Sequence, residues 1–205
     1  MQPKPAPAMM RAVSALLICA VAAIALIGSA GPVAAAEQWS LRALMVELAK
    51  TRSGSVRYRE ERHLKTMTEP VVVTGTMAYQ APDRLVKIAL TPQKETMVIE
   101  GDSLTIEREG GVGVQSLRLS EIPQLNSLIT ALRATLLGDL EALQRHFEVR
   151  VQGTRAAWSM VLTPRSGGAR QAGLRITVEG AAGRPGRFEI RQPDGDRIVV
   201  QVLDK

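Results

Sequence analysis

From Pro70 to Glu107 the chain reads PVVVTGTMAYQAPDRLVKIALTPQKETMVIEGDSLTIE. Four β-branched runs, in which apolar and polar residues alternate, are separated by turn sequences. The turns are Ala-Pro-Asp at 81–83, Thr-Pro-Gln-Lys at 91–94 and Gly-Asp at 101–102. Proline cannot donate a hydrogen bond to a strand ladder, and Gly-Asp suits a two-residue hairpin. The stretch therefore predicts an antiparallel meander.

Similar strand patterns lie on both sides of this meander. The predicted strands of the whole chain are 55–65, 71–79, 84–90, 95–100, 103–109, 114–119, 147–152, 157–164, 173–179, 186–192 and 197–203. Asp194-Gly195 supplies the turn of the last hairpin. A sheet of about eleven twisted strands must curl, split into two sheets or close into a barrel.

Two segments have helical rather than strand periodicity. The first is Trp39 to Lys50, with Ser40 as a candidate N-cap and Gly54 as the stop signal. The second is 124–137, which Gly138 ends. A short third helix, capped by Asp139, follows as far as Arg145.

The two predicted longer helices each carry an apolar stripe that needs a partner surface. We therefore predict an α+β fold, in which a curved antiparallel sheet forms an incomplete barrel and the helices cover its concave side. A two-sheet sandwich is the main alternative, but it leaves the helices without a natural surface to pack on.

The amino-terminal segment has the pattern of an export signal. Lys4 and Arg11 precede an apolar run from Ala12 to Ile27, and Ala34-Ala35-Ala36 offers small residues for a signal peptidase. The run is shorter than the ~20 residues of a spanning helix, so an uncleaved anchor is the weaker alternative. We expect a signal peptide at 1–36.

The single cysteine, Cys19, lies inside the apolar run rather than at its end, so lipidation is not expected. Cleavage before Glu37 would leave a chain without cysteine, which excludes disulfides and thiolate metal sites. Residues 37–205 are long enough for one domain with its own core.

Composition excludes some classes of function. Lys and Arg number 26 against 20 Asp and Glu, a formal net charge of +6, and the charges are interspersed. The chain has only two Trp, two Tyr and two Phe. Nucleic-acid binders combine a basic stripe with aromatic residues, so no nucleic-acid partner is expected.

Candidates for catalysis are few. His63 shares a strand face with charged residues such as Glu61, which is typical of a solvent-facing side chain, and His146 falls in the last turn of a helix. The two histidines lack ligand spacing, and Ser159 and Ser166 lack a G-x-S-x-G context. We expect no catalytic residue, no metal site and no cofactor, and hence not an enzyme.

One strand interrupts an apolar face with charge. In the first strand, Val56, Tyr58, Glu60, Arg62 and Leu64 share a face, so a Glu–Arg pair stands among apolar residues. Inward charges can protect a sheet against strand-to-strand aggregation, and this interpretation is favoured. The alternative is a polar gate or headgroup contact at a cavity mouth, formed by Glu60 and Arg62.

Several motifs together resemble the LolA family of periplasmic lipoprotein carriers. They are Tyr58-x-Glu60-x-Arg62, the hairpin from Gly75 through Tyr79 and Pro82 to Leu85, Glu100-Gly101-Asp102-x-Leu104, and Trp158-Ser159-Met160-x-Leu162-x-Pro164. The resemblance covers essentially all of 37–205. It implies an eleven-stranded half-barrel with a helical lid over a hydrophobic cavity for acyl chains.

The chain also departs from that family. The carrier proper has an arginine just before the hairpin proline, linked to cargo release, and here that position is Ala81. Aromatic residues of the carrier's cavity are largely replaced, with Leu85 and Lys87 on the matching strand. The pattern is closer to the related subfamily linked to acyl-lipid synthesis and export.

The resemblance implies a periplasmic carrier of a lipid or lipoprotein, moving cargo toward the outer membrane or an exporter. Its expected partners are an inner-membrane donor complex or exporter and an outer-membrane acceptor, and a monomer is expected. A lipid-sensing module that acts through an inner-membrane partner is the alternative. The expected lipid-binding residues are Met77, Tyr79, Leu85, Met97, Ile99, Leu128, Ile129 and Leu132. The sequence leaves open the cargo and which sheet face is concave.

Overall fold

The computed structural model describes residues 39–110, 113–165, 173–192 and 194–203. The predicted signal peptide, 1–36, lies outside the described residues. The described part contains one sheet, a short 3-10 helix and three α-helices.

The helices are α2 (Leu41–Leu48), η1 (Leu119–Glu121), α3 (Pro123–Leu137) and α4 (Leu140–His146). The strands are β1 (Ser53–His63), β2 (Val71–Gln80), β3 (Arg84–Thr91), β4 (Glu95–Glu100), β5 (Ser103–Arg108), β6 (Val114–Arg118), β7 (Phe147–Thr154), β8 (Ala157–Pro164), β9 (Arg175–Ala181), β10 (Arg184–Arg191) and β11 (Arg197–Leu203).

All eleven strands join one antiparallel sheet in the order β6-β5-β4-β3-β2-β1-β11-β10-β9-β8-β7. Two meanders, β1–β6 and β7–β11, are therefore joined by pairing of the first strand with the last, from Arg57 opposite Leu203 to His63 opposite Arg197. The sheet is not closed, since β6 and β7 are its edges. The predicted α+β fold with an incomplete barrel is confirmed.

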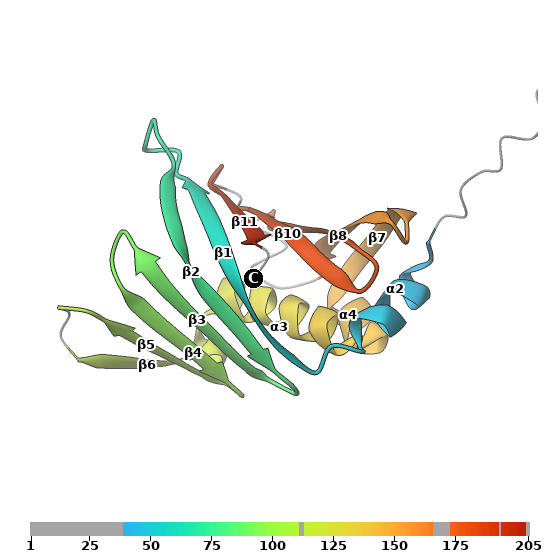
Figure 1. Cartoon of the computed structure of the whole chain (residues 1–205), viewed down its shortest axis with the longest axis horizontal. Helices are drawn as coiled ribbons and strands as arrows, with labels where there is room; N and C mark the ends of the chain where they lie inside the picture. The colour runs from blue at the N-terminus through green and yellow to red at the C-terminus, as the bar shows by residue number, and fades with distance from the viewer. Residues whose placement is uncertain (1–38, 111–112, 166–172, 193, 204–205) are drawn as a thin grey trace, which may run out of the picture. The chain divides into compact units, whose positions relative to one another are not determined.

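The helices lie on one side of the sheet, which curves around them (Figure 1). The longest helix, α3, crosses between the two meanders. Its amino-terminal half, with Leu125 and Ile129, packs with Ile99 and Leu104 of β4 and β5. Its carboxyl-terminal half, with Ala131, packs in a larger cluster that includes residues of α2, α4 and β7–β10. The helix-facing side is therefore the concave side, as predicted.

The capping residues predicted from the sequence, Ser40, Asp139 and Gly138, stand at helix ends in the structure. The Ser40 hydroxyl accepts a hydrogen bond from the Ala43 N–H at 3.1 Å, and the Asp139 carboxylate accepts one from Ala142 at 2.8 Å. Gly138 ends α3 in the left-handed conformation, with φ of 66°. The predicted stop at Gly54 is wrong, because α2 ends at Leu48 and Gly54 pairs with Tyr79 inside the sheet.

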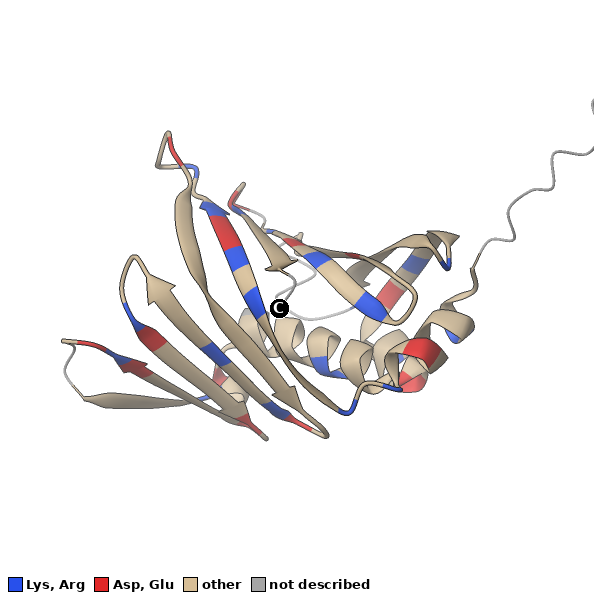
Figure 2. Ribbon diagram, viewed as in Figure 1, with Lys and Arg blue, Asp and Glu red and all other residues tan. Residues whose placement is uncertain are grey.

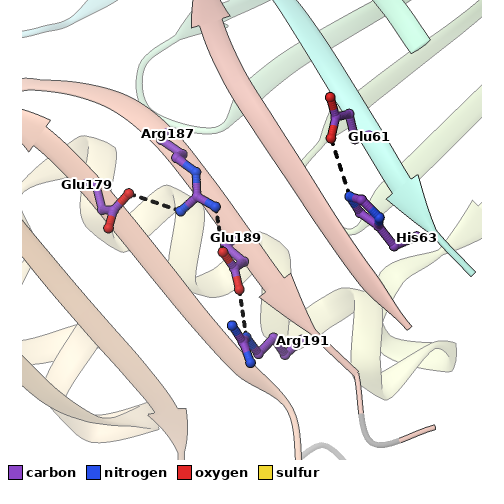
Figure 3. A network of polar contacts seen from close by, with 6 residues as sticks. All are labelled: Glu61, His63, Glu179, Arg187, Glu189 and Arg191. Atoms are coloured by element: carbon purple, nitrogen blue, oxygen red, sulfur yellow. Dashed lines mark hydrogen bonds and ion pairs between the residues drawn. The ribbon is translucent and has the colours of Figure 1, made fainter. Parts of the chain in front are cut away.

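The outer face of the sheet carries ion pairs across its centre (Figure 3). Arg187 bridges Glu179 at 3.0 Å and Glu189 at 2.6 Å, and Arg191 adds a second contact to Glu189 at 2.6 Å. On β1, His63 lies 3.3 Å from Glu61 on the same face. This face is therefore polar, and the candidate site lies on the other.

Candidate functional site

The predicted sheet residues of the site share one face. Strand register places Tyr79 opposite Leu85, and Leu85 opposite Ile99. Lys87 stands opposite both Met77 and Met97, so these two methionines flank it on that same face.

This common face is the concave one. Leu85, Met97 and Ile99 pack in one cluster with Leu125 and Ile129 of α3. Tyr79 and Ile99 are buried, whereas Met77, Leu85 and Met97 are only half-buried. All five predicted sheet residues therefore lie on the concave face, which the sequence alone did not identify.

The predicted residues of α3 point in more than one direction. Ile129 is buried against the β4–β5 side, but Leu128 packs against the cluster of α2, α4 and β7–β10. Leu132, one turn further along, is half-buried and points between the directions of Leu128 and Ile129 around the helix axis. Arg133 is the only charged residue of α3, and Figure 2 shows the rest of this helix without charge.

Between the two zones that the helix covers, the concave face has a floor made by strands alone. The buried members of this floor cluster are Tyr58, Val73, Ala89 and Val200, and Val71, Met77, Phe188 and Ile198 pack against them. Among the described residues, no helix contributes to the floor cluster. The floor cluster is therefore an apolar strip on the concave side whose members, in the described part of the chain, all belong to strands.

A cluster of charges adjoins this floor. The Glu60 side chain is only 4% exposed, and its two oxygens accept hydrogen bonds from Arg62 Nε and Lys87 Nζ, each at 2.5 Å. The Lys87 ammonium also lies over the Tyr58 ring, 5.0 Å from its centre. Glu60 and Arg62 are thus in contact on the predicted face; Lys87 was not predicted as their partner.

The surroundings of Glu60 and Tyr58 shift the pKa values of both side chains. Burial alone would raise the pKa of Glu60, but the cations of Lys87 and Arg62 outweigh it, and its pKa lies below the ordinary value. Burial, reinforced by the charge of Glu60, raises the pKa of Tyr58 to about 12. The Tyr58 hydroxyl is buried and has no hydrogen-bond partner among the described residues.

A separate open groove of about 490 Å³ lies where β1 starts and β2 turns into β3. Of the predicted lipid-binding residues, only Tyr79 lines it, together with groups such as Arg52, Gln80 and Arg84. Gln80 is next to Tyr79 and Arg84 is next to Leu85, and side chains alternate between the two faces of a strand, so Gln80 and Arg84 point to the outer face. This groove therefore opens largely away from the floor cluster.

Within the described residues, no helix is both long and apolar enough to span a membrane. The same part of the chain holds no group of three or more His, Cys, Asp or Glu side chains placed to bind a metal ion.

Comparison with known proteins supplies the family. Residues 30–199 match the family model described as outer membrane lipoprotein carrier protein LolA-like. No curated protein gives a significant match. A LolA superfamily protein from Nitrosomonas europaea is 10% identical, with a TM-score of 0.45 over 81% of this chain and 92% of that one. LprF from Mycobacterium bovis is 13% identical, with a TM-score of 0.35 over 80% and 91%.

These two structural similarities are too distant to add to the assignment, which rests on the family model. That model spans both meanders and all three helices, and it ends within β11. The chain belongs to the LolA-like family of outer membrane lipoprotein carrier proteins.

Proposed function

We propose that this protein is a periplasmic carrier that binds the acyl chains of a lipid or lipoprotein on the concave face of its sheet. The observation that carries the proposal is the floor cluster, an apolar strip made by β1–β3, β10 and β11. Its partly buried members keep apolar surface on the concave side; they are Val71, Met77, Phe188 and Ile198. Membership of a carrier family agrees with this use of the face.

The residues proposed to contact the chains are those predicted from the sequence. Met77, Leu85 and Met97 on the sheet and Leu132 on α3 are only half-buried, so they retain apolar surface that a ligand could cover. Burial contributes ~0.8 kcal/mol per methylene, so a chain of about a dozen carbons can bind without any polar contact. Methionine side chains are flexible and adapt to ligands of different shape.

The helix α3 is the proposed lid, but its two ends differ. At its end, a Cβ on Gly138 would lie 2.3 Å from the Met45 carbonyl oxygen, so this junction packs tightly against α2. We expect the carboxyl-terminal end to stay fixed to α2 while the end near Pro123 moves away from β4 and β5. The cargo would come from an inner-membrane donor complex or exporter and pass toward the outer membrane.

Uptake of a ligand tests the proposal directly. Delipidated protein is mixed with a fluorescent fatty acid, displacement is titrated, and native mass spectrometry gives the stoichiometry; we expect saturable binding of one amphiphile. Leu132→Glu should weaken uptake at least about tenfold, since a charge would face the ligand. Leu90→Glu is the matched control, because Leu90 is 56% exposed on the outer face.

The proposal fails if the delipidated protein takes up no amphiphile, or if Leu132→Glu and Leu90→Glu behave like the wild type. A lipid-sensing module would instead be indicated if lipid changed the affinity of the protein for an inner-membrane partner and no lipid passed to an acceptor.

A further inference from the structure

The concave face carries a charge cluster with more positive than negative charge. Glu60 is its single carboxylate, and Arg62 and Lys87 are its two cations. The nearby pair of Glu95 and Arg108, 2.5 Å apart, is on the same face and is neutral in sum. One positive charge therefore remains beside the apolar floor cluster.

Stability is a weak reason for these charges. Moving charges out of water costs free energy, and the attraction between the charges often does no more than offset this cost. A protein in which well-packed apolar residues replace a buried ion cluster is often just as stable. Apart from the Glu95–Arg108 pair, the neighbours of the cluster on this face include the apolar side chains of Val73 and Ala89 and the Tyr58 ring. A second cation is moreover more than one buried carboxylate requires.

The two cations keep capacity for a ligand. Among the described residues, Glu60 is the hydrogen-bond partner of both Lys87 and Arg62, and each donates one N–H to it. An ammonium has three donors and a guanidinium five, so several remain. Their side chains are 25% and 40% exposed, whereas that of Glu60 is 4% exposed, so a ligand would meet the cations and not the carboxylate.

A polar group without a partner adds an independent observation. Tyr58 is completely buried, and its hydroxyl has no hydrogen-bond partner within the described part of the chain. Lys87 lies over the ring of the same residue. A buried hydroxyl normally has a partner, and leaving it without one costs free energy. The cluster therefore combines spare cationic donors with an unused hydroxyl at the border of an apolar floor.

We propose that Arg62 and Lys87, held in place by Glu60, bind the anionic headgroup of the amphiphile whose acyl chains lie on the floor cluster. The ligand is thus an acyl lipid that ends in a carboxylate or phosphate, and Glu60 is a positioning residue. This inference rests on the proposed carrier function and adds the chemical class of the cargo.

The test compares ligands that share one chain and differ in headgroup. Hexadecanoate, hexadecyl phosphate and neutral monopalmitoylglycerol are titrated by calorimetry into delipidated wild-type protein, Lys87→Met and Lys94→Met. Lys94→Met is the matched control, because it removes the same charge from an exposed turn between β3 and β4. We expect the wild type to bind an anionic ligand about tenfold more tightly than the neutral one, because charge-assisted hydrogen bonds are strong.

Lys87→Met should lose most of this preference and keep its affinity for monopalmitoylglycerol, whereas Lys94→Met should resemble the wild type. Tighter binding of hexadecyl phosphate alone would assign a phosphate, and tighter binding of both anions an oxyanion of either kind. Should Lys87→Met unfold, as circular dichroism would show, Arg62→Gln replaces it.

Two results overturn the headgroup site and leave the carrier function standing. One is equal wild-type affinity for the neutral and the anionic ligands, and the other is an equal loss of affinity for all three in Lys87→Met. If the wild-type protein binds none of them, the carrier function itself is wrong, and the headgroup site with it.

Discussion

Replacing Glu60 with Gln keeps the shape of a buried side chain and removes its charge. Both Glu60 oxygens accept a hydrogen bond of 2.5 Å, from Arg62 and Lys87. In Gln one oxygen becomes an NH₂ group that faces a cation. Removing one partner of a fully buried ion pair costs ~3–5 kcal/mol. Because the side chains of Arg62 and Lys87 are 40% and 25% exposed, water offsets part of this cost, and we expect a loss of ~2–3 kcal/mol in unfolding free energy.

Urea unfolding followed by circular dichroism at neutral pH measures this loss. For a domain of this size it corresponds to a melting temperature lower by about 5–10 °C. Glu61→Gln is the control, since Glu61 is the next residue on β1 but faces outward, is 31% exposed and contacts Arg59 and His63. Such exposed pairs contribute less than ~1 kcal/mol.

The pH dependence gives a second check. The pKa of Glu60 is lower in the folded than in the unfolded chain, whose ordinary value is 4.5. Its contribution to stability is therefore complete above pH 4.5 and is lost as the pH falls through the folded pKa. The difference in unfolding free energy between the wild type and Glu60→Gln should be constant above pH 4.5 and should become smaller in acid. Equal stabilities of Glu60→Gln and Glu61→Gln would refute the reasoning, and so would a difference that acid leaves unchanged.

Three further substitutions test the sheet. In Gly75→Ala the new Cβ would lie 1.9 Å from the Ile88 carbonyl oxygen, so β2 and β3 must separate, and we expect a loss of ~2–4 kcal/mol in thermal unfolding. Gly54→Ala, whose Cβ would meet nothing within 4 Å, should change stability by less than ~0.5 kcal/mol. Tyr58→Phe should stabilise the protein by about 1 kcal/mol, because it removes a buried hydroxyl without a partner. The wild type should lose stability between pH 10 and about 12, where Tyr58 ionises only on unfolding, and Tyr58→Phe should lose less.

Most of the fold could be predicted because its signals are local. Proline-containing and glycine-containing turns separate alternating runs, and Ser40 and Asp139 cap their helices as their side chains suggest. The prediction failed at Gly54, where the pairing of β1 with β2 continues as far as Ser53 opposite Gln80. That pairing depends on residues far along the chain, which a local breaker signal does not report.

The site was predicted less completely, for a reason of geometry. The alternation in β3 places Leu85, Lys87 and Ala89 on one face, but sequence alone does not say that this face meets α3. The contact between Lys87 and Glu60 joins residues 27 apart, across the intervening strand β2. It requires the registers of two strand pairs, in which Tyr58 stands opposite Gly75 and Gly75 opposite Ala89.

The pairing of β1 with β11 also has a consequence for when the protein can fold. The first strand of the sheet receives its second neighbour only when Arg197–Leu203 has been synthesised, although it belongs to the centre of the sheet. Contacts so distant in sequence form slowly, because a long loop must close first. An incomplete chain can build the β1–β6 meander but must leave the inner edge of β1 unpaired. The centre of the sheet is therefore completed only when Arg197–Leu203 has joined β1.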